Sequence, residues 1–197
     1  MKMRTIWTVL LLLVATMGWA QEPEHFYGMK SGRVKQKVAV MGQEQVMEAY
    51  FDDWGNTQGS ILSVEGAQGL VEILTLKKGD KVTMVQLDTN EGMTTTSQEA
   101  AVNYLNLTDE MIDKYQILEL DEKQTVLGHE CTGYNMIQDL QGQQAQVTSW
   151  VWNGIPLKSE LKMGEITQTI EVLELEEVSE VPAKYVTIPE GAKITEM

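Results

Sequence analysis

Two side chains capable of metal binding and nucleophilic chemistry, His129 and Cys131, lie close together in this sequence. Because they are two positions apart in a predicted strand, both would point to the same face. Two ligands are too few for a zinc site. Residues spaced in this way stand roughly 6–7 Å apart at Cα, so Cys131 could not easily use His129 as its base. We therefore predict no metal, no cofactor and no enzymatic activity, and a buried, unreactive Cys131.

Aromatic and methionine side chains indicate a different chemistry, the binding of an apolar molecule. Their placement is open to two interpretations, an ordinary core layer or a surface that lines a ligand. Methionine suits an adaptable interior in either case. If the second interpretation holds, we expect a cavity between the sheet and a short helical insert. Its expected lining residues are Tyr50, Trp54, Met84, Trp150, Trp152, Met111 and Tyr115.

The elements that must position these residues are mostly strands. From Val34 onward, apolar and polar residues alternate with the period of two that is typical of β-strands. Trp150 and Trp152 are predicted to share one face of a strand. Hairpin turns are predicted around Gly79 and at Asn153-Gly154, since glycine readily adopts the positive φ that such turns need. A last strand is expected over 185–188.

The strand pattern is interrupted over 97–116, where two short helices are predicted. Thr96 and Glu99 have the spacing of a capping box at the start of the first helix. Thr108 has the position of an N-cap for the second helix. Asp109 follows it and suits the positive end of a helix dipole. This helical insert is expected to close one side of the sheet.

The first twenty residues have the pattern of an export signal. Lys2 and Arg4 precede an apolar run that ends at Val14, and small residues precede an expected cleavage site before Gln21. The run is shorter than the roughly 20 residues that a spanning helix needs. We expect removal of residues 1–20, a flexible N-terminus over 21–32 and one domain over 33–197. The processed protein is expected in the periplasm, or secreted, without stable insertion into a membrane.

Composition limits the partners of the chain. It has 15 Lys and Arg against 29 Asp and Glu, a net charge of −14. Because this field repels a phosphate backbone, binding of nucleic acid is excluded as a function class. Cys131 is the single cysteine, so the chain cannot form a disulfide within itself. Its stability must come from a packed core.

Three motifs carry a resemblance to a known family. They are a "G-x-x-x-x-x-Y" strand from Gly128 to Tyr134, "G-I-P-L-K" over 154–158 after a tryptophan-bearing strand, and "V-P-x-x-x-x-x-I-P-x-G" over 181–191. In this order they resemble a family of exported bacterial domains of unknown function (the DUF4412 type). That family is similar to the periplasmic lipoprotein-carrier, or LolA-like, fold.

The resemblance implies a mainly β fold, namely a curved antiparallel sheet or incomplete β-barrel with a short helical insert closing it. It also implies a cavity for an apolar ligand such as acyl chains. The carriers use a cavity arginine, whereas this chain has only Arg33 after residue 20, so no carrier residue is transferred. Two functions stay open. The first is a non-enzymatic carrier or binding protein for a hydrophobic, lipid-like molecule. The second is an envelope interaction module with a filled core, which binds another protein through an exposed strand edge or patch.

Overall fold

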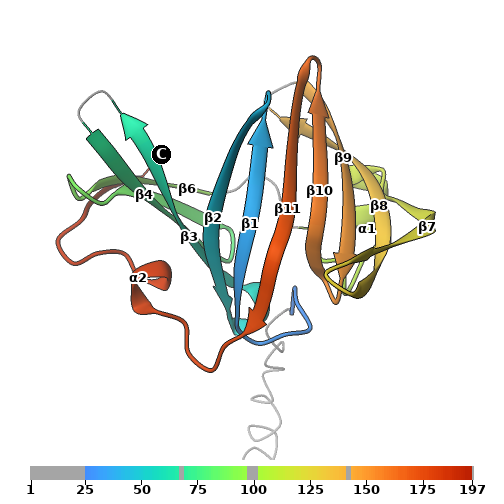
Figure 1. Cartoon of the computed structure of the whole chain (residues 1–197), viewed down its shortest axis with the longest axis horizontal. Coiled ribbons are helices and arrows are strands. Elements are labelled where there is room, and N and C mark those ends of the chain that lie inside the picture. The colour runs from blue at the N-terminus through green and yellow to red at the C-terminus, as the bar shows by residue number, and fades with distance from the viewer. Residues whose placement is uncertain (1–24, 67–68, 97–101, 141–142, 197) are drawn as a thin grey trace, which may run out of the picture.

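The computed structural model describes residues 25–66, 69–96, 102–140 and 143–196. These residues form one long, curved, open sheet with few helices (Figure 1), which confirms the predicted fold class. The strands are β1 (Gly32–Val40), β2 (Gln43–Asp52), β3 (Thr57–Gly66), β4 (Gly69–Lys78), β5 (Lys81–Gln86), β6 (Glu91–Thr96), β7 (Leu118–Val126), β8 (His129–Leu140), β9 (Gln143–Trp152), β10 (Ile155–Met163), β11 (Ile166–Glu177) and β12 (Lys193–Glu196).

The strand order in the sheet is β12-β6-β5-β4-β3-β2-β1-β11-β10-β9-β8-β7. Sequential strands are neighbours within β1–β6 and within β7–β11, so the sheet consists of two meanders. The meanders join where β1 pairs with β11. Every described pair is antiparallel except β12 with β6, which is parallel. We call the β1–β11 pairing the seam.

The seam carries alternating basic residues on its first strand. Arg33, Lys35 and Lys37 of β1 form ion pairs with acidic side chains on the neighbouring strands. Arg33 contacts Glu48 of β2 and lies 3.3 Å from Glu176 of β11. The acidic partners hold the Arg33 pKa above its ordinary value. Opposite charges on adjacent strands favour this register over others.

Two predicted hairpin turns are confirmed, and their backbone angles explain the residue choice. Gly79, between β4 and β5, has a φ of 58°. Asn153 and Gly154, between β9 and β10, have φ values of 50° and 79°. Positive φ at both central residues is the condition of a type I′ turn, and Asn-Gly meets it at low cost.

Three short helical segments lie in the described part of the chain. They are the 3-10 turn η1 (Asp53–Gly55), α1 (Asp109–Tyr115) and α2 (Ala183–Val186). The predicted cap of α1 is confirmed, since the Thr108 hydroxyl accepts a hydrogen bond from the Met111 amide at 3.2 Å. No helix among the described residues is both long enough and apolar enough to span a membrane.

One sequence-based prediction of secondary structure falls partly outside the described residues, and another is wrong. Of the first predicted insert helix, residues 97–101 lie outside the described residues, and residues 102–108 form turns without a helix. The strand predicted over 185–188 is largely α2, followed by an irregular stretch. There Tyr185 packs its ring against Tyr50, with ring centroids 4.3 Å apart. Four residues are too few to display a helical period, so the sequence pattern could not reveal this helix.

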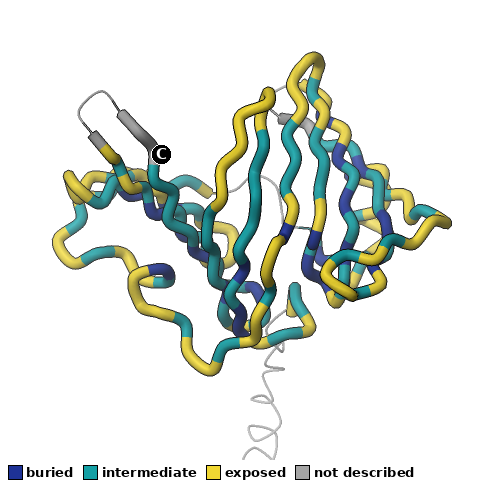
Figure 2. The backbone as a smooth tube through the Cα atoms, viewed as in Figure 1, coloured by how far each residue is buried: buried dark blue, intermediate teal, exposed yellow. Residues whose placement is uncertain are grey.

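The core has separate parts on the long sheet. Along β9 every second residue from Ala145 to Val151 is buried, and Figure 2 shows exposed residues gathered at the hairpin ends. One cluster lies between α1 and the sheet and contains Tyr115, Met136 and Val147. The larger cluster straddles the seam and contains Val34, Phe51, Cys131, Ile155, Leu157 and Val172.

Candidate functional site

A hollow of about 450 Å³ lies across the seam, and we call it the central groove. This volume falls within the roughly 300–1,000 Å³ of sites for small molecules. Its walls come from β1 to β5, from β10 and β11, and from the segment before β1. Its main lining side chains are Tyr27, Val34, Gln36, Ala49, Phe51, Gln58, Ser60, Thr75, Lys77, Val82, Ile155, Pro156, Ser159 and Ile170.

The central groove lies on the concave side of the sheet. Thr75 of β4 and Ser159 of β10 both line it, although β3, β2, β1 and β11 lie between their strands in the sheet. In a flat sheet these five steps would separate the two strands by roughly 24 Å. Both can border one hollow of this size only because the sheet curves around it.

Strand register explains which side chains enter the groove. Val34 pairs with Ala49, Ala49 with Ser60, and Ser60 with Thr75, which makes one row across four strands. Side chains directly opposite each other on adjacent strands share a face. This row is made of small or β-branched residues, so it leaves the concave side hollow.

A second row runs beside the first. It consists of Phe51, Gln58, Lys77 and Val82, each opposite the next on an adjacent strand. Phe51 is 3% exposed and belongs to the seam cluster. This row therefore places a large apolar ring, an amide and an ammonium group along one side of the groove.

The segment before β1 closes one end of the central groove. Phe26 and Tyr27 donate backbone hydrogen bonds to the Trp54 carbonyl at 2.9 and 3.0 Å, and Gly28 donates one to the Asn153 carbonyl at 3.0 Å. These bonds hold residues 26–28 against η1 and the β9–β10 turn. Residues 25–31 belong to the stretch that the sequence predicts to be flexible, yet here they are bonded to the sheet.

Tyr27 places a buried phenol at this closed end. Its ring meets Phe51 edge-on, with centroids 4.9 Å apart. Burial raises the pKa of Tyr27 to about 12, and a hydrogen bond with Gln58 opposes that rise. The phenol is therefore neutral at physiological pH and serves as a hydrogen-bonding group rather than as a base.

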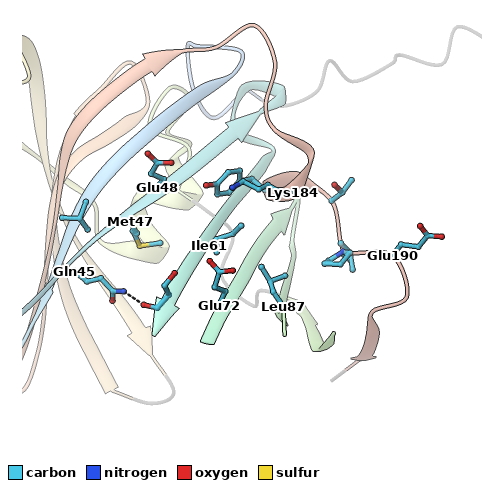
Figure 3. Close-up of a pocket in the computed structure, with 14 residues that line it drawn as sticks. Gln45, Met47, Glu48, Ile61, Glu72, Leu87, Lys184 and Glu190 are labelled. Atoms are coloured by element: carbon cyan, nitrogen blue, oxygen red, sulfur yellow. Dashed lines mark hydrogen bonds between the residues drawn. The ribbon is translucent and has the colours of Figure 1, made fainter. Parts of the chain in front are cut away.

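A second hollow, of about 560 Å³, lies under the segment that follows α2, and we call it the C-terminal pocket. Figure 3 shows Gln45, Glu48, Ile61 and Glu72 on the strands around it, with Lys184 of α2 and Glu190 on the segment that covers it. The Gln45 amide donates to the Ser63 carbonyl at 2.7 Å. The lining of the C-terminal pocket mixes acids, an amide and apolar groups, which suits a water-filled hollow better than a site for an apolar ligand.

Gly59 fixes how closely the covering segment approaches the sheet. A Cβ atom at Gly59 would lie only 1.7 Å from the backbone oxygen of Tyr185. No L-side chain fits there, so glycine is required for this packing. Tyr185 itself is 7% exposed.

The residues predicted to line a ligand do not form one surface. Tyr50 borders the central groove, but its ring packs on Tyr185. Trp54 lies in η1 and stacks on His25, with centroids 4.3 Å apart. Met84 is 40% exposed on β5. Two pairs do lie together, Trp150 with Trp152 beside the seam cluster and Met111 with Tyr115 on α1.

His129 and Cys131 have structural partners of their own. The His129 ring stacks on Trp152, with centroids 3.9 Å apart. The Cys131 thiol is fully buried and points toward the His129 carbonyl oxygen at 3.5 Å. Burial raises the pKa of Cys131. Among the described residues, no three His, Cys, Asp or Glu side chains are grouped so that they could hold a metal ion.

Most of the lining of the central groove was missed by sequence reasoning. Of the seven residues expected to line a ligand, only Tyr50 borders this groove. Among the described residues that line the groove there is no histidine, cysteine or carboxylate. The lining does hold serine and threonine hydroxyls and the Lys77 amine, but no imidazole or carboxylate base accompanies them there. What the groove offers chemically is apolar burial with several hydrogen-bonding groups and one cation.

No known protein family and no curated protein matches the sequence. Among solved structures, an uncharacterized conserved protein from Thermus thermophilus superimposes with a TM-score of 0.53 at 10% identity, over 85% of this chain and 91% of that one. PNGF-II superimposes with a TM-score of 0.50 at 10% identity, over 85% of this chain but only 31% of its own. These likenesses concern the fold alone. Lipoprotein LppX from Mycobacterium tuberculosis gives a TM-score of 0.43 at 10% identity, over 79% of this chain and 91% of that one, and a score this low does not establish a shared fold.

Proposed function

We propose that the protein is a non-enzymatic binding or carrier protein for a hydrophobic, lipid-like molecule, which it holds in the central groove. The observation that carries this proposal is an open hollow of about 450 Å³ on the concave side of the sheet, walled largely by apolar side chains. Val34, Phe51 and Ile155 connect the groove to the buried seam cluster, so its floor is part of the packed core. Among the described lining residues, no histidine or carboxylate accompanies the serine and threonine hydroxyls to act as their base, which favours binding over catalysis.

The free energy available from such a groove is sufficient for a chain-like ligand. Each buried CH₂ group gains about 0.8 kcal/mol before the ordering costs of ligand and protein are subtracted. A ligand of roughly ten carbons can thus bind without a charged contact. The proposal includes an envelope location, with removal of residues 1–20, and kinship with the LolA-like carriers.

Binding of N-phenyl-1-naphthylamine, an uncharged apolar fluorophore, tests this proposal. Ala49→Phe places a ring in the groove and should weaken binding at least tenfold. Gln43→Phe, at the exposed start of the same strand, is the matched control and should bind like the wild type. Ser60→Leu narrows the groove with a smaller change, in case Ala49→Phe does not fold. Equal affinity of all four folded proteins would refute the proposal.

An envelope interaction module remains the second candidate, and one observation favours it. Strand β7 is at the end of the sheet and has no described neighbour beyond it. Its first residue, Leu118, is 62% exposed. Unpaired edges can add a strand from another chain. Solvent extraction and mass spectrometry of protein from its native envelope separate the candidates, since a carrier should release a stoichiometric apolar molecule and a module should not.

A further inference from the structure

The charge of the central groove is opposite to that of the chain. The protein has 29 acidic and 15 basic residues. Even so, the described residues that line the groove include no carboxylate and only one ionisable side chain that is charged at neutral pH, Lys77. If acids were spread without regard to the groove, some would be expected among its lining residues. Their absence leaves one cation in a largely apolar hollow.

Lys77 lies where its charge is poorly compensated by the protein. The residue is half-buried in β4, between Gln58 and Val82 of the adjacent strands. Its Nζ atom sits 5.5 Å from the centre of the Phe26 ring, at the closed end of the groove. Within the described part of the chain no carboxylate approaches it within ion-pair distance.

A cation of this kind is costly unless an anion joins it. Removing an ammonium group from water is unfavourable, and one aromatic ring offsets only part of that cost. Burial accordingly lowers the pKa of Lys77. The neighbouring Lys78 provides a contrast, because it is exposed and does not line the groove.

The lining of the groove complements an amphiphile, a molecule with a charged end and an apolar chain. Polar groups of Gln58 and Tyr27 adjoin the Lys77 end, where the two residues share a hydrogen bond. Apolar side chains of Val34, Ala49 and Ile170 line the rest of the groove, together with uncharged polar side chains, namely those of Gln36, Ser60, Thr75 and Ser159. A molecule with one anionic end and one apolar chain matches both parts at once.

We propose that Lys77 binds the anionic head group of a single-chain amphiphile whose apolar chain occupies the central groove. This inference rests on the proposed function and specifies its ligand class. The negative field of the whole protein does not prevent it, because charges beyond about 8 Å are largely screened at physiological ionic strength. Inside the groove the nearest charge is that of Lys77.

The test compares three probes with the same twelve-carbon chain, namely dodecanoate, dodecan-1-ol and dodecyltrimethylammonium. The wild type should bind dodecanoate about tenfold or more tighter than dodecan-1-ol, as expected for a charge-assisted contact. The cationic probe should bind most weakly. Lys77→Met should remove the preference for dodecanoate and leave the affinity for dodecan-1-ol within about twofold, since methionine keeps the apolar stem. Lys77→Arg should retain the preference, and Lys78→Met is the matched control that should not alter it.

The outcomes separate this inference from the function on which it rests. If no probe binds the wild type, the proposed function fails and the inference with it. If dodecanoate and dodecan-1-ol bind equally well, or if Lys77→Met weakens both to the same degree, the groove binds apolar chains but Lys77 does not select an anion. That result overturns the inference and leaves the proposed function intact.

Discussion

Replacing Gly59 with alanine tests how the segment that follows β11 is attached to the sheet. The new Cβ would stand 1.7 Å from the Tyr185 backbone oxygen and 2.7 Å from its carbonyl carbon. The contact must lengthen by roughly 1.3 Å merely to reach 3.0 Å, below which real Cβ atoms are essentially never found. Because the obstacle is backbone, no rotation of a flexible side chain can relieve it. Gly59 is not among the residues of positive φ, so the alanine backbone itself is not strained.

The cost of Gly59→Ala can be bounded from two routes. If the strand and segment both shift slightly, the penalty is that of overpacking, about 1–3 kcal/mol. If α2 instead leaves the sheet, the protein loses the burial of Tyr185, about 1.5–3 kcal/mol, and its ring contact with Tyr50, about 0.5–1.5 kcal/mol. The protein takes the route of lower cost, so we expect a loss of about 1–3 kcal/mol in the free energy of unfolding.

Urea denaturation followed by tryptophan fluorescence measures this loss, and limited proteolysis shows which route is taken. Rapid cleavage between residues 178 and 192 would indicate release of the segment. Ser60→Ala is the matched control on the same strand and should change stability by less than about 0.5 kcal/mol. Gly59→Ala with wild-type stability and wild-type proteolysis would show that α2 does not pack on β3 as described.

Three further predictions concern other parts of the chain. Cys131 should resist thiol reagents in the native protein, and Cys131→Ser should cost about 1–3 kcal/mol in urea denaturation, because it buries a hydroxyl in an apolar cluster; rapid native labelling would contradict this. Asp52 accepts hydrogen bonds from the Ser31 hydroxyl at 2.6 Å and the Asp53 amide at 2.8 Å, which hold its pKa below its ordinary value of 3.8. The ionised Asp52 carboxylate therefore stabilises the protein above that ordinary pKa, and this stabilisation is lost as pH falls through the lowered pKa. Ser31→Ala should accordingly destabilise the protein at pH 7 and progressively less below pH 3.8. A loss of stability that does not depend on pH would argue against this role. Intact mass of protein recovered from the envelope should correspond to a chain that begins at Gln21, and retention of residues 1–20 would exclude cleavage.

The strands and tight turns could be predicted because local chemistry determines them. Alternating valines and lysines from Val34 to Val40 produced the correct strand, and the Asn153-Gly154 pair marked a turn that only such residues adopt easily. Thr108 was recognisable as a cap by its place before an acidic turn. At Tyr185, where four residues are too few to display a helical period, sequence reasoning predicted a strand in place of a helix.

The central groove could not be predicted because it depends on register and curvature. Ala49 and Ser60 create hollow space only because they lie opposite each other on adjacent strands. Nothing in the sequence identifies that pairing. Large aromatic residues such as Trp150 were chosen for their type, but they fill space and so lie beside the core rather than around a hollow. A row of small residues is the more informative signal once the strand pairing is known.

The seam also determines the order in which the protein can fold. Each meander joins neighbouring strands through short turns, so its contacts are local and can form early. The seam instead joins residues such as Arg33 and Glu176, which are 143 positions apart. Closing a loop of that length is slow relative to hairpin formation.

A chain made from the N-terminus has its first strand long before the partner of that strand exists. Until β11 arrives, the free edge of β1 remains available for wrong pairing, and its three basic residues favour an acidic neighbour over an apolar one. The central groove has walls from both meanders, so it comes into existence only when the seam closes. A ligand that binds there would bind only after the seam has closed, and it would slow unfolding by stabilising the closed seam.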